Sequence, residues 1–380
     1  MTADPTIALL RDLVAIDSVN PSLVPGARGE AEVARRIAEE CIAIGLRVEV
    51  TEVAPGRPNV VAVLEGRAPG ASLMFCGHID TVGVTGMNRP FEPVTREGRL
   101  YGRGSQDMKG GVAAMIGAVR VLAESGGLAN GRVIIAAVVD EEHASLGAEA
   151  LVASWRADAA VVTEPTDLDV AVAHKGFQWV EVQTRGRAAH GSRPREGRDA
   201  ILRMGRVLHK LEALDRALQK RAAHALLGTA SLHASLVGGG RELSSYPDQC
   251  TLTLERRTLP GEPLGVALQE VEAIVASLKE ADAEFEADAR AIFGRDGYEI
   301  HPSARLPSSL ASAAESVGCT PAKVGMTFWT DAAILGGAGI PSVLFGPGGA
   351  GLHSAEEYVR LEDVRLCRDG LAAFARDFTR

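Results

Sequence analysis

The chain has 380 residues, of which 46% are hydrophobic and 23% are charged. One hydrophobic core rarely supports a chain of this length, so two domains are expected. The net charge of −9 offers no basic surface to a polyanion, and we therefore expect no nucleic-acid partner.

The N-terminal sequence MTADPTIALLRDLVAIDSV has an apolar stripe at helical spacing, without the basic start and apolar block of a signal peptide. No stretch approaches the roughly 18 apolar residues needed to cross a bilayer, so no membrane partner is expected. Five cysteines are scattered along the chain and never form a CxxC pair, which favours reduced thiols in a cytoplasmic protein. Oxygen and nitrogen ligands would then have to bind any metal.

In the first part of the chain, predicted strands alternate with predicted helices. The elements are a helix at 29–44, strands at 46–53, 59–64 and 72–76, a helix at 108–124, and strands at 133–139 and 159–162. The apolar run 133–139 is unbroken, which is typical of a strand covered on both faces. This alternation predicts an α/β domain with a mostly parallel central sheet.

The pattern changes after residues 174–176. The elements there are strand 177–184, helix 199–214, strands 230–237 and 250–258, helix 264–278 and strand 284–292. Their β-α-β-β-α-β order predicts a ferredoxin-like α+β domain with a small antiparallel sheet. The first pattern then returns with helix 306–317, strand 340–345 and helix 361–378. We therefore expect a main domain of residues 1–175 and 294–380, with residues 176–293 inserted into it.

Polar side chains follow the ends of several predicted strands, where sites in open α/β sheets usually lie. His78 and Asp80 come directly after strand 72–76. Residues two apart leave a strand on the same side, and a carboxylate there can accept the second ring N–H of a metal-binding imidazole. A surface histidine beside a turn aspartate is the alternative interpretation.

Asp107 lies in the glycine-rich sequence GRGSQDMKGG, which opens the predicted helix 108–124. The phosphate-loop pattern is absent, and the glycines suit a backbone bent tightly to direct one carboxylate. Alternatively, Asp107 is an ordinary helix cap.

The buried strand 133–139 ends in Asp140-Glu141-Glu142-His143. Three carboxylates so close together repel one another unless a cation compensates their charge. Adjacent glutamates can also divide the work, one binding metal and the other transferring protons. The alternative is an acidic helix start.

Glu164 follows strand 159–162, and His353 follows a glycine-rich loop after strand 340–345. Together with the preceding residues they supply two histidines and several carboxylates at strand ends, a ligand set that suits zinc or a related metal.

The ordered motifs GHIDTV, GRGSQDMKGG, VVDEEH, VTEPT, AAHGSRP, RRTLPGE and GLHSAEE resemble those of the M20 metallopeptidase/amidohydrolase family. Acetylornithine deacetylase, succinyl-diaminopimelate desuccinylase, aminoacylase and glutamate carboxypeptidase belong to this family. The resemblance covers nearly the whole chain. It implies a zinc-exopeptidase-like catalytic domain, and it implies that residues 176–293 form a lid through which the protein forms a homodimer.

The resemblance also implies two Zn²⁺ ions per chain, with Co²⁺ or Mn²⁺ as possible substitutes. The implied roles are His78 and Glu164 on one ion, Glu142 and His353 on the other, Asp107 bridging both, Asp80 orienting His78, and Glu141 acting as general base and acid. In several members the peptide bond after the bridging aspartate is cis, which predicts a cis Asp107–Met108 bond.

Five further residues are assigned to the oxyanion or to substrate contacts. His190 matches the lid histidine that stabilises the oxyanion, although the sequence around it also suits a turn histidine. Arg257 matches a residue that commonly binds the substrate carboxylate, although a solvated strand residue is the alternative. Ser244 departs from the family, which often has Asn there, and Thr330-Asp331 are expected to line the substrate pocket. His143 and His174 are given no role.

The resulting expectation is a cytoplasmic hydrolase that releases an amino acid from a small N-acyl amino acid, as acetylornithine deacetylase does. The first alternative is a dipeptidase or carboxypeptidase that cleaves short peptides at the same metal site. The second is a metal-free relative that only binds small ligands. The presence of every expected ligand and of Glu141 argues against the metal-free relative.

Overall fold

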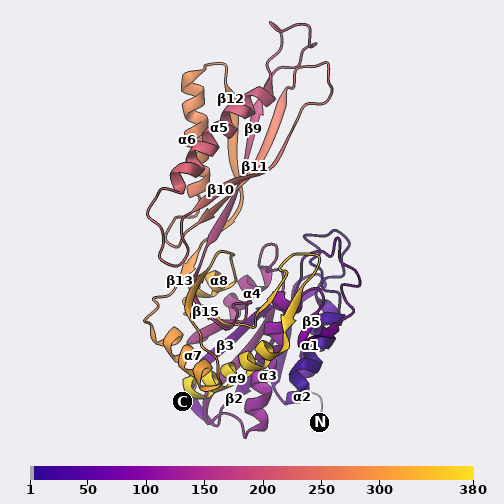
Figure 1. Ribbon diagram of the computed structural model, residues 1–380, viewed down its shortest axis with the longest axis vertical. Coiled ribbons are helices and arrows are strands. Elements are labelled where there is room, and N and C mark those ends of the chain that lie inside the picture. The colour runs from indigo at the N-terminus through magenta and orange to yellow at the C-terminus, as the bar shows by residue number, and fades with distance from the viewer. Residues whose placement is uncertain (1–3) are drawn as a thin grey trace. The chain divides into compact units, whose positions relative to one another are not determined.

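A computed structural model describes residues 4–380 and divides them into two compact units (Figure 1). The larger unit comprises the chain up to Val172 together with Ile300–Val324 and Thr330–Arg380. The smaller unit comprises Ala173–Glu299 and Gly325–Trp329, whereas the sequence places the inserted domain at residues 176–293.

A single mixed sheet forms the centre of the larger unit. Its strands are β1 (Arg47–Ala54), β2 (Arg57–Glu65), β6 (Asn130–Val138), β3 (Ala68–His78), β7 (Ala159–Val162), β15 (Ser342–Leu344) and β8 (Val170–His174), in that spatial order. Two short strands, β13 (Tyr298–Glu299) and β14 (Lys323–Met326), both pair with β8. The four central strands β6, β3, β7 and β15 run parallel, and antiparallel pairs flank them. The predicted α/β fold with a largely parallel sheet is therefore confirmed.

Helices cover both faces of this sheet. The helices are α1 (Pro5–Ala15), α2 (Ala31–Ile44), α3 (Gly110–Glu124), α4 (Leu146–Ser154), α7 (Arg305–Ser316), α8 (Ala332–Gly337) and α9 (Leu361–Phe378). Val133 and Ile135 of β6 belong to one core cluster with side chains of α1, α2, α3, α7 and α9, whereas the equally buried Ile134 and Ala136 lie outside that cluster. In Figure 1 the helices α1, α3 and α9 lie together, so segments from both ends of the chain share this core.

A second, small antiparallel sheet was not predicted, because its strands are at most three residues long. It contains β16 (Gly349–Ala350), β17 (Tyr358–Arg360), β5 (Arg99–Tyr101) and β4 (Val94–Arg96), in that order. Pairing of β17 with β5 brings the chain before β17 alongside the chain after β5. Those two segments carry His353 and Asp107.

The smaller unit has the predicted β-α-β-β-α-β order. Its elements are β9 (Gly176–Arg185), α5 (Ala200–Leu218), β10 (Ser231–Gly239), β11 (Gln249–Thr258), α6 (Val266–Ala281) and β12 (Glu286–Arg295). The strands form an antiparallel sheet in the order β10-β11-β9-β12, and its core includes Val180, Leu252 and Val271.

All five cysteines are buried and none forms a disulfide, as predicted. No helix within residues 4–380 is both long enough and apolar enough to span a bilayer.

Candidate functional site

Three neighbouring strands deliver the polar residues of the site. His78 is the last residue of β3, Glu141 and Glu142 follow β6, and Glu164 follows β7. Because β6, β3 and β7 are adjacent and parallel, their carboxyl ends meet at one edge of the sheet. The local sequence thus places one imidazole among three carboxylates.

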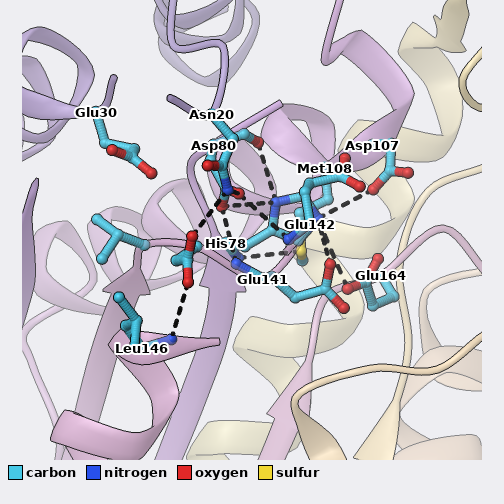
Figure 2. A network of polar contacts seen from close by, with 12 residues as sticks. Asn20, Glu30, His78, Asp80, Asp107, Met108, Glu141, Glu142, Leu146 and Glu164 are labelled. Atoms are coloured by element: carbon cyan, nitrogen blue, oxygen red, sulfur yellow. Dashed lines mark hydrogen bonds and ion pairs between the residues drawn. The ribbon is translucent and has the colours of Figure 1, made fainter. Parts of the chain in front are cut away.

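His78 lies at the centre of this group (Figure 2). Its Nε2 is 3.0 Å from Oδ1 of Asp107, 3.9 Å from Oε2 of Glu141 and 3.8 Å from Oε1 of Glu164. Among the described residues, two groups can each offer ligand atoms within 4.8 Å of one another: His78 with Glu141 and Glu164, and His78 with Asp107 and Glu142. The two groups share His78, so the candidate metal positions are neighbours.

Asp107 connects the two histidines. Its Oδ1 faces His78, and its Oδ2 lies 3.3 Å from Nε2 of His353. The same His353 nitrogen is 3.1 Å from Oε2 of Glu142. The structure therefore brings all five residues that the family resemblance assigns to metal ions into one cluster, with Asp107 between the two halves.

The backbone around Asp107 is irregular, as the glycine-rich sequence suggested. The Asp107–Met108 peptide bond is cis, which confirms that prediction. Helix α3 begins only at Gly110, so Asp107 is not its cap. A Cβ on Gly111 would lie 1.9 Å from the carbonyl oxygen of Thr163, which explains the need for glycine where α3 packs against the chain before Glu164.

Glu357 holds the Asp107 loop in place, and sequence reasoning did not single it out. Its Oε1 accepts hydrogen bonds from the backbone N–H groups of Gln106 (2.9 Å) and Asp107 (3.1 Å). Its Oε2 accepts from the N–H of Gly104 (3.0 Å) and from Nη1 of Arg103 (2.6 Å). One buried carboxylate thus joins the loop of Asp107 to the chain that follows His353.

Asp80 faces the other side of His78. The imidazole Nδ1 is 3.1 Å from the carbonyl oxygen of Asp80 and 3.6 Å from its Oδ1, so main chain and side chain both approach the ring. The Asp80 carboxylate also accepts hydrogen bonds from the N–H groups of Glu141 and Glu142, each at 3.2 Å. It therefore braces the turn that carries the two glutamates.

Of the three adjacent carboxylates whose charge a cation is expected to compensate, Asp140 has its own cation in Arg57. Its carboxylate is buried away from the cluster and pairs with Nη1 of Arg57 at 2.8 Å. The segment after β6 is a turn, and α4 starts only at Leu146, so an acidic helix start is also excluded.

Burial dominates the electrostatics of the cluster. Desolvation, with the nearby carboxylates Glu164, Asp331 and Glu142, raises the pKa of Glu141 well above its ordinary value. Burial and Asp107 raise the pKa of Glu142 to about 7, and burial likewise raises the pKa of Glu164.

Burial lowers the pKa of His78, but hydrogen bonds with Asp107 and Asp80 outweigh it and raise that pKa well above its ordinary value. Hydrogen bonds to Asp107 and Glu142 raise the pKa of His353 to about 10. For Asp107, burial is outweighed by hydrogen bonds from His353 and His78, which lower the pKa of its carboxyl. Bound cations would compete with protons for the same imidazole nitrogens.

The donor set fits divalent cations. Four carboxylates and two imidazoles are the oxygen and nitrogen ligands that zinc takes in proteins without cysteine. Within residues 4–380, Oε1 of Glu142 is a buried oxygen with no hydrogen-bond partner, as a ligand atom that awaits an ion would be.

The remaining predicted residues lie in both units. Thr330 and Asp331 are buried in the larger unit, where Asp331 contributes to the raised pKa values of Glu141 and Glu164. His190 and Ser244 are exposed residues of the smaller unit, and the carbonyl of Ser244 accepts the N–H of Gly191 at 2.7 Å.

Arg257 is also in the smaller unit, on β11. Its side chain is 33% exposed, and its Nε donates to Oε1 of Glu255 at 2.5 Å. The neighbouring Arg256 is fully buried and pairs with Glu262 and Glu270. Of the two arginines, Arg257 is therefore the one accessible to a ligand.

Comparisons with known proteins agree with this geometry. The model of peptidase family M20/M25/M40 matches residues 74–377. An acetylornithine deacetylase from Myxococcus xanthus is 30% identical over 382 residues, which cover 98% of this chain and 97% of that protein. An N-formyl-4-amino-5-aminomethyl-2-methylpyrimidine deformylase from Bacillus subtilis is 29% identical over 90% of this chain and 87% of its own. The crystal structure of aminopeptidase PepT from Bacillus cereus shares the fold, with a TM-score of 0.80 at 20% identity over 98% of both chains.

Proposed function

Because the chain belongs to peptidase family M20/M25/M40 and is a hydrolase of amide bonds, we propose that it releases an amino acid from an N-acyl amino acid, as an acetylornithine deacetylase does. The observation that carries this proposal is the convergence of two histidines and four carboxylates, one of which is Asp107, in one cluster. The relative from Myxococcus xanthus supports the deacylase assignment, because its similarity extends over nearly the whole length of both chains.

We assign two Zn²⁺ ions to the cluster, with Co²⁺ or Mn²⁺ as substitutes. His78 and Glu164 would hold one ion, Glu142 and His353 would hold the other, and Asp107, whose two oxygens face the two histidines, would serve both. When bound, the two cations polarise the scissile carbonyl and lower the pKa of the attacking water.

Glu141 is the proton carrier in this proposal. It lies 3.9 Å from the His78 nitrogen but is not needed as a ligand, which leaves its carboxylate available to the water. Its buried setting raises its proton affinity, as suits a general base that takes a proton from water and returns it to the leaving amine. Asp80 keeps His78 oriented by contacting its second ring nitrogen.

We assign the substrate carboxylate to Arg257, because its guanidinium is accessible whereas that of Arg256 is enclosed by two glutamates. His190 would donate a hydrogen bond to the developing oxyanion. Ser244 and Thr330-Asp331 are proposed substrate neighbours.

We also propose that the smaller unit is the lid and mediates a homodimer. Its edge strand β10 exposes Leu236 and Val237, which are 71% and 62% accessible. Light scattering should give twice the chain mass; a monomer at working concentration would remove this part of the proposal. The cytoplasmic location stays a prediction, supported by five free, buried thiols.

The test is a substrate panel on metal-replete protein. One amino acid is offered as its N-acetyl, N-succinyl and N-formyl derivatives and within a dipeptide, and initial rates give kcat/KM for each. The N-acetyl or N-succinyl compound should be the best substrate. Preference for the dipeptide would replace the deacylase by a peptidase.

Deformylation is a second candidate because of the Bacillus subtilis relative. A preference for the N-formyl compound, which persists when the amino acid is replaced by an amine without a carboxylate, would favour it. Metal analysis tests the alternative that the protein is a metal-free relative which only binds small ligands. Fewer than one ion per chain after metal-replete preparation would favour that alternative.

A further inference from the structure

A buried asparagine near the N-terminus contacts the residues that hold the catalytic turn (Figure 2). Asn20 is 0% exposed and follows α1. Its main chain is fixed, because its N–H donates to the carbonyl of Thr81 at 2.9 Å and the N–H of Thr81 donates to Ser18 at 3.0 Å. The position of Asn20 beside Asp80 is therefore determined by backbone pairing.

The amide of Asn20 uses all of its hydrogen-bonding groups. Its Oδ1 accepts the N–H of Ser22 at 2.8 Å, which establishes that Nδ2 points the other way. Nδ2 donates one hydrogen to Oδ2 of Asp80 at 2.7 Å and one to Oδ1 of Asp140 at 3.0 Å. A single uncharged amide thus joins two fully buried carboxylates.

Those two carboxylates hold the turn of Glu141 and Glu142 from both sides. Asp80 accepts the N–H groups of the two glutamates and faces His78. Asp140 precedes the turn, and its Oδ2 accepts the N–H of Leu146, the first residue of α4, at 3.4 Å. Nη1 of Arg57 also contacts Oδ1 of Asp140, the oxygen that accepts from Asn20, at 2.8 Å. Without a donor between them, Asp80 and Asp140 would repel each other and the turn would shift.

We propose that Asn20 is a positioning residue of the metal centre, which fixes Asp80 against Asp140 and through them the placement of His78, Glu141 and Glu142. The role assigned to these three residues rests on the proposed function. An aspartate would add a third carboxylate at the point where two already meet, so the amide is the group that this position requires.

Asn59 is a matched control. It is also buried, at 4% exposure, and braces the same connection between β6 and α4. Its Oδ1 accepts the N–H of Val139 at 3.1 Å and its Nδ2 donates to the carbonyl of Gly147 at 2.8 Å, so it contacts main chain only. Replacing either asparagine by alanine removes a buried amide. Only Asn20→Ala also removes the hydrogen bonds that join Asp80 to Asp140.

The test compares Asn20→Ala with Asn59→Ala in the full-length protein. Co²⁺ is titrated into metal-free protein, its visible absorption spectrum reports ligand geometry, and thermal unfolding is measured in parallel. Asn20→Ala should weaken Co²⁺ binding about tenfold or more, as loss of a residue behind metal ligands usually does, and should change the spectrum. Asn59→Ala should lower the melting temperature with the wild-type affinity and spectrum. Equal Co²⁺ affinities in the two variants would overturn the proposal.

Asn20→Ser provides a second measurement if Asn20→Ala does not fold. A hydroxyl donates only one hydrogen, so this variant should again weaken Co²⁺ binding, and a wild-type spectrum and affinity would overturn the proposal. With a substrate that the wild type cleaves, kcat should fall while KM changes little. If the wild type binds Co²⁺ but cleaves no acyl amino acid, the proposed substrate is wrong while the Co²⁺ titration still decides the role of Asn20. A wild type that binds no Co²⁺ would overturn both.

Discussion

Oδ2 of Asp107 lies 3.3 Å from Nε2 of His353, so the loop before α3 meets the loop before β17 at a carboxylate–imidazole contact. The other oxygen of Asp107 faces His78. An aspartate placed in this way can serve two cations, whereas His353 can serve only one. Substitution of Asp107 and substitution of His353 should therefore leave different numbers of metal ions bound per chain.

Asp107→Ala should reduce bound metal to well below one ion per chain, while His353→Ala should retain about one, because the site of His78 and Glu164 stays intact. Inductively coupled plasma mass spectrometry of the dialysed variants measures both metal contents. His143→Ala alters a neighbouring histidine without an assigned role and should keep the wild-type content. Equal losses in Asp107→Ala and His353→Ala would contradict the bridging arrangement.

Glu141→Gln should abolish turnover without displacing metal. The amide cannot take a proton from water, so kcat should fall by a factor of at least about 10². Glu142→Gln should instead lose metal, because its Oε2 is the contact to His353. Metal content and kcat measured on the same preparations separate the two roles. An active Glu141→Gln enzyme would require another general base.

Glu357→Gln should destabilise the protein and disturb the Asp107 loop together. The substitution leaves the buried Arg103 without its anionic partner, and breaking such a pair costs about 3–5 kcal/mol. A double-mutant cycle with Arg103→Met, followed by denaturant unfolding, isolates the pair. The coupling should be favourable by at least about 1 kcal/mol. Additive losses would show that Glu357 acts through the backbone N–H groups alone.

The sequence predicted most of this site because its ligands belong to local patterns. His78, Glu142 and Glu164 lie at or just after the ends of apolar strands, and the structure shows that these strands are parallel neighbours. The meeting of Asp107 with His353 could not be predicted in the same way. It depends on the short strands β5 and β17, which are too brief to leave a hydrophobic pattern.

The residues that hold the site in place from behind were even harder to predict from the sequence. Asn20 and Arg57 have no distinctive local pattern, and their role depends on side chains that come from other parts of the chain. Adjacency in the sequence groups Asp140 with Glu141 and Glu142 as carboxylates that need a cation. The side chain of Asp140 instead faces Arg57, and sequence spacing alone cannot show such a partner.

His174 should make the free energy of unfolding depend on pH below about 6.5. It is fully buried in the smaller unit, and its Nδ1 lies 3.0 Å from the carbonyl of Lys175, to which it donates when the imidazole is neutral. Burial lowers the pKa of His174 to about 4, below its ordinary value of 6.5. Below pH 6.5 the unfolded chain therefore binds a proton at this position that the folded chain does not. This contribution to stability is complete above pH 6.5 and is lost as the pH falls toward 4, for a total of about 3 kcal/mol.

His174→Asn removes the titrating group and retains an N–H donor near the Lys175 carbonyl. Denaturant unfolding at pH 7 and pH 4.5, with chelator present so that metal release does not contribute, should show a smaller acid loss in the variant. The difference from wild type should be about 2–3 kcal/mol, because most of the proton uptake by the unfolded chain falls between these two pH values. His209→Gln, which changes an exposed histidine of α5, controls for the loss of one imidazole. Parallel pH profiles for wild type and His174→Asn would show that the buried imidazole is already protonated in the folded protein.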